Sequence, residues 1–153
     1  KSSIYVVILA GLFCFTRWIK TNPKWQMRSL FLLSCVILPG LICLGLKILL
    51  GRARPIEWLQ HGAYGFHFFE TQASFLSFPS GHAVTITGLM WGLCYLFPRY
   101  WGAWVAILIT VALSRVVVTA HYLSDIMAAM LLAVLTVMWI HRQWTERKIM
   151  SYP

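Results

Sequence analysis

Three short polar groups interrupt a sequence that is otherwise strongly apolar, and they contain residue types that bind anions. The first group lies in the segment KILLGRARP, where Lys47 and Arg54 are seven residues apart. Seven residues are about two turns of an α-helix, so both cations are expected on nearly the same face before Pro55 ends the helix. Two cations on one face can share a single anion.

The second group is Pro79-Ser80-Gly81-His82, which directly precedes an apolar run and therefore marks a helix start. Free backbone N–H groups and the helix dipole favour an anion at such a position. Gly81 lets the anion approach closely, and Ser80 can cap the helix or donate a hydrogen bond. The group predicts an anion-binding helix N-terminus with a histidine beside it.

The third group lies in SRVVVTAHYLSD, which contains Arg115, His121 and Asp125. His121 and Asp125 are one helical turn apart, so the carboxylate can hold the imidazole in one tautomer and one orientation.

Each group has a plainer explanation when it is taken alone. Lys47 and Arg54 could extend from a helix end to the membrane surface, Ser80 could be only a helix cap, and His121 with Asp125 could be a structural pair. These explanations weaken when the groups occur together, because an ionisable residue inside a membrane span costs about 2.5–3.5 kcal/mol.

The composition indicates a membrane protein, with 59% hydrophobic and 11% charged residues and a mean hydropathy of +0.72. Soluble domains carry about a quarter of charged residues. The apolar runs are continuous and no linker separates them, so the sequence predicts one domain, residues 1–153, in the all-α class: a polytopic transmembrane helical bundle. The cysteines form no Cys-x-x-Cys pair and are expected to be buried thiols. They are Cys14, Cys35, Cys43 and Cys94.

About five spans are expected. They are residues 4–18, 30–50 and 82–97, with two more inside 101–140. Pro39-Gly40 predicts a kink in the second span. Residues 101–140 are too long for one crossing, and the polar cluster within 114–125 is the place to divide them. The first span is short and the chain begins with Lys1, so a preceding span is one explanation and a reduced bundle is the other.

If the helices alternate in direction, most basic residues fall on one side, which the positive-inside rule makes cytoplasmic. These residues are Arg17, Lys20, Lys24, Arg28, Arg99, Arg142, Arg147 and Lys148. The three polar groups then share the extracytoplasmic face. The net charge of +9 indicates topology and some attraction to anionic lipid, rather than nucleic-acid binding.

Together the groups supply cations, N–H donors, two histidines and one carboxylate that can orient a histidine. Carboxylates are too few for a magnesium site, and His82, His121 and Asp125 are few ligands for a catalytic zinc. Metal-free phosphoryl transfer fits better, with one histidine attacking and the other protonating the leaving oxygen. The groups that would meet the transition-state charge are Lys47, Arg54, Arg115 and the Ser80-Gly81 amides. No metal and no other cofactor is expected.

The three groups resemble the signatures of the type 2 phosphatidic acid phosphatase superfamily: Lys-x6-Arg-Pro, Pro-Ser-Gly-His and Ser-Arg-x5-His-x3-Asp. They stand at residues 47–55, 79–82 and 114–125, and the resemblance covers about half of the chain. It implies a phosphohistidine mechanism with His121 as the nucleophile, Asp125 orienting it and His82 as the general acid. It also implies a set of residues that hold the phosphate. These are Lys47, Arg54, Ser80, Gly81 and Arg115.

The resemblance further implies an integral membrane lipid phosphate phosphatase of the bacterial inner membrane, with its site facing the periplasm. Substrates in such a family include undecaprenyl diphosphate, phosphatidylglycerol phosphate, phosphatidic acid and lipid A phosphates. A non-catalytic protein that binds or transports a lipid phosphate in the same basic pocket is the alternative. Vanadate-dependent haloperoxidases have a similar pocket, but they are soluble, and the apolar spans disfavour them. Membrane members typically have six spans, one more than expected here.

Residues 56–78 form a short connecting segment rich in aromatic side chains. Such residues suit a membrane interface. Two interpretations are open: they anchor the protein at the interface, or they floor a lateral entrance for a lipid tail.

Overall fold

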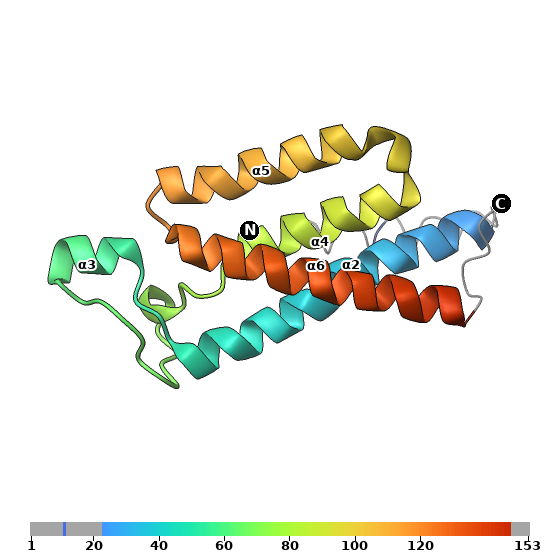
Figure 1. Ribbon diagram of the computed structural model, residues 1–153. Helices are drawn as coiled ribbons and strands as arrows, with labels where there is room; N and C mark the ends of the chain where they lie inside the picture. Colours follow the sequence, from blue (N-terminus) through green and yellow to red (C-terminus); the bar gives the residue numbers. More distant parts are fainter. Residues whose placement is uncertain (1–10, 12–22, 148–153) are drawn as a thin grey trace.

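The computed structural model describes residue 11 and residues 23–147, and the regular structure within them is helical (Figure 1). The helices are α2 (Pro23–Leu50), α3 (Pro55–His61), α4 (Gly81–Leu96), α5 (Trp101–Val117) and α6 (Leu123–Glu146), with 3-10 turns at Ala73–Phe75 and Pro98–Tyr100. An isolated bridge joins Arg52 to Phe66, and no strand forms in the described residues. The predicted all-α class is confirmed.

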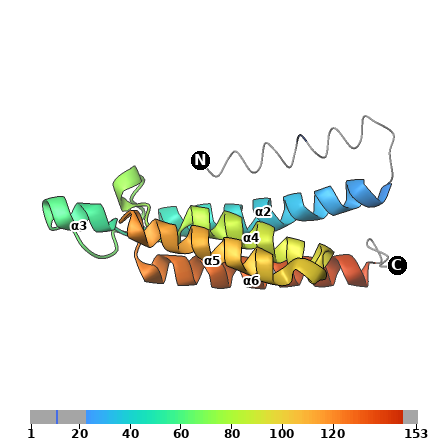
Figure 2. The same ribbon diagram turned by 90° about the horizontal axis from the view of Figure 1, so that it is seen from above.

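Four helices, α2, α4, α5 and α6, run alongside one another, and α3 lies beyond one end of the bundle (Figures 1 and 2). Helix α4 is central, because it packs against each of the other three. Its sequence, GHAVTITGLMWGLCYL, is apolar around most of its circumference, which is typical of a helix enclosed by others. The core therefore follows the axis of α4.

Glycines allow α4 to approach α2 closely. A Cβ atom added at Gly88 would lie 2.2 Å from the carbonyl oxygen of Cys35, and one at Gly92 would lie 3.0 Å from Cδ2 of Leu32. Small residues commonly mark such close crossings between membrane helices. Cys35 and Cys43 are buried free thiols, as predicted, whereas Cys94 is only partly buried. Cys14 lies outside the described residues.

Among the described residues, three helical segments are long and apolar enough to cross a membrane. They are Lys24–Leu50, Pro98–Val117 and Leu123–Glu146. The division of residues 101–140 into two helices is confirmed, because α5 ends at Val117 and α6 begins at Leu123. The span expected at residues 4–18 lies outside the described residues.

Some predicted boundaries were wrong. Helix α2 begins at Pro23, well before residue 30, and it contains Pro39, where the predicted kink stays a prediction. Helix α4 begins at Gly81, one residue earlier than predicted, and α6 continues to Glu146 rather than residue 140. Pro23 is well placed at a helix start, where its missing N–H is not needed.

Candidate active site

All three polar groups lie at the end of the bundle where α3 projects (Figure 1). This is the end at which α2 and α5 finish and α4 and α6 begin. Lys47 belongs to the last turn of α2, and Arg115 to the last turn of α5. Ser80 is the N-cap of α4, and Asp125 lies in the first turn of α6. Helix direction therefore gathers residues that are up to 78 positions apart in the sequence.

The first group does not form one continuous helix, so the prediction that Pro55 ends the helix carrying Lys47 was wrong. Helix α2 ends at Leu50, and Pro55 begins α3 with Arg54 as its N-cap. Gly51 adopts φ +53°, which permits the chain to leave the helix. A Cβ atom at this position would lie 1.8 Å from the carbonyl oxygen of His67, so only glycine fits.

Lys47 and Arg54 nevertheless interact electrostatically. Lys47 is within electrostatic reach of both Arg54 and Asp125. Its Nζ atom donates a hydrogen bond to the carbonyl of Leu76. The Nε atom of Arg54 donates to the carbonyl of Ala73 over 3.0 Å. The segment before α4 thus holds both cations by its backbone.

The second group starts α4 as predicted. The Ser80 side chain accepts a hydrogen bond from the N–H of Ala83 over 3.4 Å, which makes Ser80 a helix cap. The Ser80 N–H donates to the carbonyl of Asp125 over 3.1 Å, so the starts of α4 and α6 are tied together. Ser80 is fully buried, whereas Gly81 and His82 are partly exposed. His82 is within electrostatic reach of Arg115 and His121.

The third group places His121 just before α6, with a buried carboxylate nearby. The Nδ1 atom of His121 lies 2.9 Å from the carbonyl oxygen of Ser77 and 3.7 Å from Oδ2 of Asp125. The shorter distance is the hydrogen bond, so Ser77 is the direct partner of the imidazole. Asp125 is fully buried, and its Oδ2 accepts from the Ser77 hydroxyl over 2.6 Å and from the Tyr122 N–H over 2.9 Å.

Two residues of this site were not identified from the sequence. Arg52 forms an ion pair with Asp125, and Ser77 contacts both His121 and Asp125. Arg52 lies inside the first polar group, and Ser77 lies three residues before Ser80. A buried cation needs a partner, but the burial of Arg52 is visible only in the fold, so no signal in the sequence pointed to it.

The described residues contain no group of three His, Cys, Asp or Glu side chains close enough to hold a metal ion.

The aromatic segment between α2 and α4 is largely exposed. The exposed fractions of Trp58, Tyr64, Phe68 and Phe69 are 54%, 63%, 64% and 72%. Tyr64 contacts Tyr122, the neighbour of His121, edge to face with ring centroids 6.0 Å apart. This exposure is what both interpretations of the segment require, so interfacial anchoring and a lateral entrance both stay predictions.

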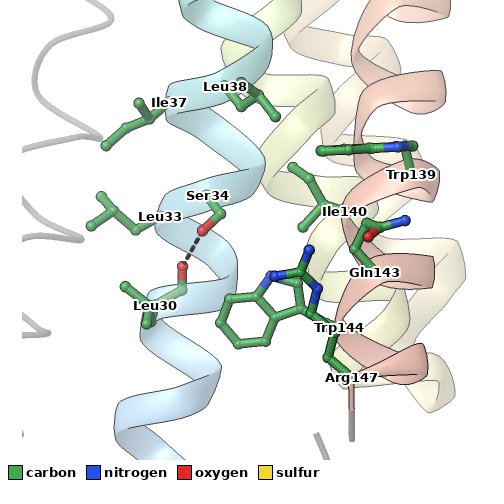
Figure 3. A pocket seen from close by; sticks show the side chains of 10 residues that line it. All are labelled: Leu30, Leu33, Ser34, Ile37, Leu38, Trp139, Ile140, Gln143, Trp144 and Arg147. Atoms are coloured by element: carbon green, nitrogen blue, oxygen red, sulfur yellow. Dashed lines mark hydrogen bonds between the residues drawn. The ribbon is translucent and has the colours of Figure 1, made fainter. Parts of the chain in front are cut away.

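A separate apolar pocket lies toward the other end of the bundle, between α2 and α6 (Figure 3). Its volume is about 470 Å³. Leu33 and Ile37 line it from α2, and Trp139 and Trp144 line it from α6. None of the residues in the three polar groups reaches it, so it is distinct from the candidate active site.

The long apolar helices place this chain in the class of helical-bundle membrane proteins, with basic residues, two histidines and a buried carboxylate gathered at one end. Residues 28–149 match the sequence model of the PAP2 superfamily. The chain therefore belongs to the PAP2 superfamily, the family whose signatures its motifs resemble.

Two curated relatives are both called lipid A 1-phosphatase. The chain is 40% identical to the protein of Rhizobium etli strain CFN 42 over 100 residues. This aligned segment covers 65% of this chain and 43% of the relative. It is 39% identical to the protein of Rhizobium johnstonii strain 3841 over 100 residues. That aligned segment covers 65% of this chain and 41% of the relative. The chain thus spans less than half the length of these relatives. No solved structure matches it.

Proposed function

We propose that this protein hydrolyses a phosphate or diphosphate group of a membrane lipid through a phosphohistidine intermediate, without a metal ion. The observation that carries this proposal is the environment of His121. Its Nδ1 atom is 2.9 Å from the Ser77 carbonyl oxygen, and a carbonyl can only accept a hydrogen bond. The proton is thereby assigned to Nδ1, and the lone pair of Nε2 is left for attack on phosphorus.

The negative charge of the phosphoryl group requires fixed positive partners. Lys47, Arg54 and Arg115 are the cations that the three motifs bring to this end of the bundle. In the transition state their charge would stabilise the equatorial oxygens. The Nζ bond of Lys47 to Leu76 and the Nε bond of Arg54 to Ala73 would keep both side chains in place before substrate arrives.

The start of α4 would supply further donors. The Ser80 N–H already donates to the Asp125 carbonyl, so the free amides at this helix start would belong to Gly81 and His82. This modifies the sequence-based expectation that the Ser80 amide binds phosphate. Ser80 would act mainly as the cap that holds the first turn of α4 in position.

His82 would be the general acid. It lies in the first turn of α4, is partly exposed, and is within electrostatic reach of Arg115, His121 and Lys47. A histidine in this position can protonate the departing lipid oxygen and then activate the water that hydrolyses the phosphohistidine. Asp125, 3.7 Å from Nδ1 of His121, would stabilise the positive charge that the imidazole develops during attack.

The phosphate at the 1-position of lipid A is the favoured substrate, because both matched relatives are named for it. The basic residues predicted on the opposite side of the membrane support a site at the periplasmic face of the inner membrane. Undecaprenyl diphosphate, phosphatidylglycerol phosphate and phosphatidic acid carry the same reactive group and are the competing substrates.

A panel of these four lipids tests the proposal. Purified protein in detergent micelles would be incubated with each lipid at equal surface concentration, and released phosphate would be measured against time. Turnover of at least one lipid, with lipid A fastest, is expected. Binding of the lipids without phosphate release would instead favour the non-catalytic binding or transport protein.

A further inference from the structure

Ser77 stands between the imidazole of His121 and the carboxylate of Asp125. Its carbonyl oxygen is 2.9 Å from Nδ1 of His121, and its hydroxyl donates to Oδ2 of Asp125 over 2.6 Å. Ser77 is fully buried, so solvent cannot replace either bond. The carboxylate therefore fixes the position of His121 chiefly by fixing Ser77.

Arg52 holds both members of this pair. Its Nη1 atom forms the ion pair with Oδ1 of Asp125 and also donates to the hydroxyl of Ser124 over 2.8 Å. Its backbone carbonyl accepts the N–H of Ser77 over 3.0 Å. One residue thus contacts Asp125 through its side chain and Ser77 through its main chain.

Two aromatic rings hold the guanidinium of Arg52. Its Cζ atom lies 4.3 Å from the centre of the Tyr122 ring and 5.4 Å from the centre of the Phe66 ring. Cation–π contacts at these distances stabilise a guanidinium and restrict its orientation. A lysine would keep the charge but would lose the planar contact with the rings and the fork of donors.

Fold stability alone is a weak explanation for this arrangement. A buried ion pair often contributes no more to stability than apolar residues of similar volume. Arg52 also has a buried Nε atom that lacks a hydrogen-bond partner among the described residues, which adds a further penalty. A buried arginine with an unmet donor, joined to the carboxylate next to a candidate nucleophile, is better explained by a role in the site.

We propose that Arg52 is a positioning residue for His121, which it orients through Asp125 and Ser77 without contacting the phosphate. The inference rests on the proposed function and assigns Arg52 a role different from that of Lys47 and Arg54. Arg52 is already committed to Asp125 and enclosed by two rings, and its side chain is only 11% exposed.

The first test compares Arg52→Gln with wild type for phosphate release from a lipid phosphate that the wild type hydrolyses. A misplaced nucleophile slows chemistry but leaves phosphate contacts intact, so kcat is expected to fall by about 100-fold while KM changes less than about twofold. Arg52→Lys should recover part of kcat. Arg142→Gln is the matched control, because Arg142 also forms an ion pair, with Glu146, but on the exposed surface at the other end of α6.

The second test is a double-mutant cycle between Arg52→Gln and Asp125→Asn, with kcat as the readout. If Arg52 acts through Asp125, its loss should cost much less in the Asp125→Asn background than in the wild type. Ser77→Ala removes the hydroxyl but keeps the carbonyl, and it should give an intermediate loss of kcat. Should Arg52→Gln fail to fold, Arg52→Lys carries the same cycle.

Three results would overturn the inference. The first is a higher KM with an unchanged kcat in Arg52→Gln. The second is folded Arg52→Gln protein with kcat and KM both unchanged. The third is a loss of kcat on Arg52→Gln that is as large in the Asp125→Asn background as in the wild type. Each requires active wild-type protein. A wild type that releases phosphate from no lipid would contradict the proposed function itself, and the inference would fall with it.

Discussion

The Cε atom of Lys47 lies 3.6 Å from the point where a Cβ atom on Gly81 would stand. The last turn of α2 therefore reaches across the first residue of α4, and the bare backbone of Gly81 faces a cation. This relationship joins the first polar group to the second. Under the proposed function, the phosphate would be bound in the space beside Gly81, between this amine and the helix N-terminus.

Gly81→Ala tests this space. A methyl group at 3.6 Å from Lys47 makes an ordinary van der Waals contact, so the protein should fold with a melting temperature close to that of the wild type. It would occupy the approach of the phosphate, so kcat/KM should fall by about 10-fold to 100-fold. The measurements are thermal unfolding in detergent and initial rates of phosphate release.

Gly88→Ala is the control, because the same change in α4 should affect the fold instead. The new Cβ would lie 2.2 Å from the carbonyl oxygen of Cys35, and α2 and α4 would have to separate. Overpacking of this kind costs about 1–3 kcal/mol. Normal stability of Gly88→Ala, or unfolding of Gly81→Ala, would contradict the packing of α2 on α4.

The membrane orientation is tested by single cysteines in a background without native cysteines. Thr71 lies in the exposed loop near α3, and Arg147 follows α6 at the opposite end. In intact bacterial cells whose outer membrane has been permeabilised, Thr71→Cys should react with an impermeant thiol reagent. Arg147→Cys should react only after the inner membrane is opened. The reverse pattern would place the site at the cytoplasmic face.

The helices are largely predictable from the sequence because lipid requires long apolar runs, and polar residues then mark where those runs must end. The polar stretch before Asp125 correctly divided α5 from α6, and Ser80 correctly capped α4. The end of the second span at residue 50 was predicted correctly, but the expectation that the helix continues to Pro55 was wrong. The chain leaves the helix at Gly51, which adopts φ +53° and lies so close to the backbone of His67 that no Cβ atom fits.

The contacts of Asp125 were harder to predict from the sequence than the motifs were. Arg52 meets Asp125 across 73 residues, and Ser77 meets it across 48. Contacts between residues this far apart in the sequence leave no periodic pattern from which they could be predicted. Within 47–55 the sequence presents three cations, and only the fold distinguishes the buried Arg52 from Lys47 and Arg54.

Phosphate release should not depend on metal ions. If Lys47, Arg54 and Arg115 supply the positive charge, phosphate release should continue at an unchanged rate in excess chelator. Vanadate, which imitates the five-coordinate phosphoryl group, should inhibit. Loss of activity in chelator that added magnesium restores would contradict a metal-free mechanism.

The nucleophile can be tested by replacing His121. His121→Ala should lower kcat by at least about 1000-fold, because the change removes the imidazole that is proposed to attack phosphorus. Asp125→Asn should cost less, since the Ser77 carbonyl still accepts the Nδ1 proton. Quenching the reaction of labelled substrate in alkaline denaturant, in which the P–N bond of a phosphohistidine is stable, should trap phosphoprotein in the wild type and none in His121→Ala. Substantial turnover by His121→Ala would remove the phosphohistidine from the mechanism.

The final prediction separates the role of His82 from that of its neighbour Gly81. A general acid matters most when the departing oxygen is strongly basic, as in an alkyl or glyceryl phosphate, because that oxygen leaves poorly without a proton. A nitrophenyl phosphate has a much better leaving group. His82→Ala should therefore lose about 100-fold or more in single-turnover rate on a lipid phosphate and far less on the aryl ester.

Gly81→Ala provides the comparison, since it narrows the phosphate site and should slow both esters by a similar factor whatever the leaving group. Rates must be taken with enzyme in excess, so that the same chemical step is measured for both substrates. Equal losses for His82→Ala on the two esters would mean that His82 binds the phosphate or supports the start of α4, and the proton would then have to come from water.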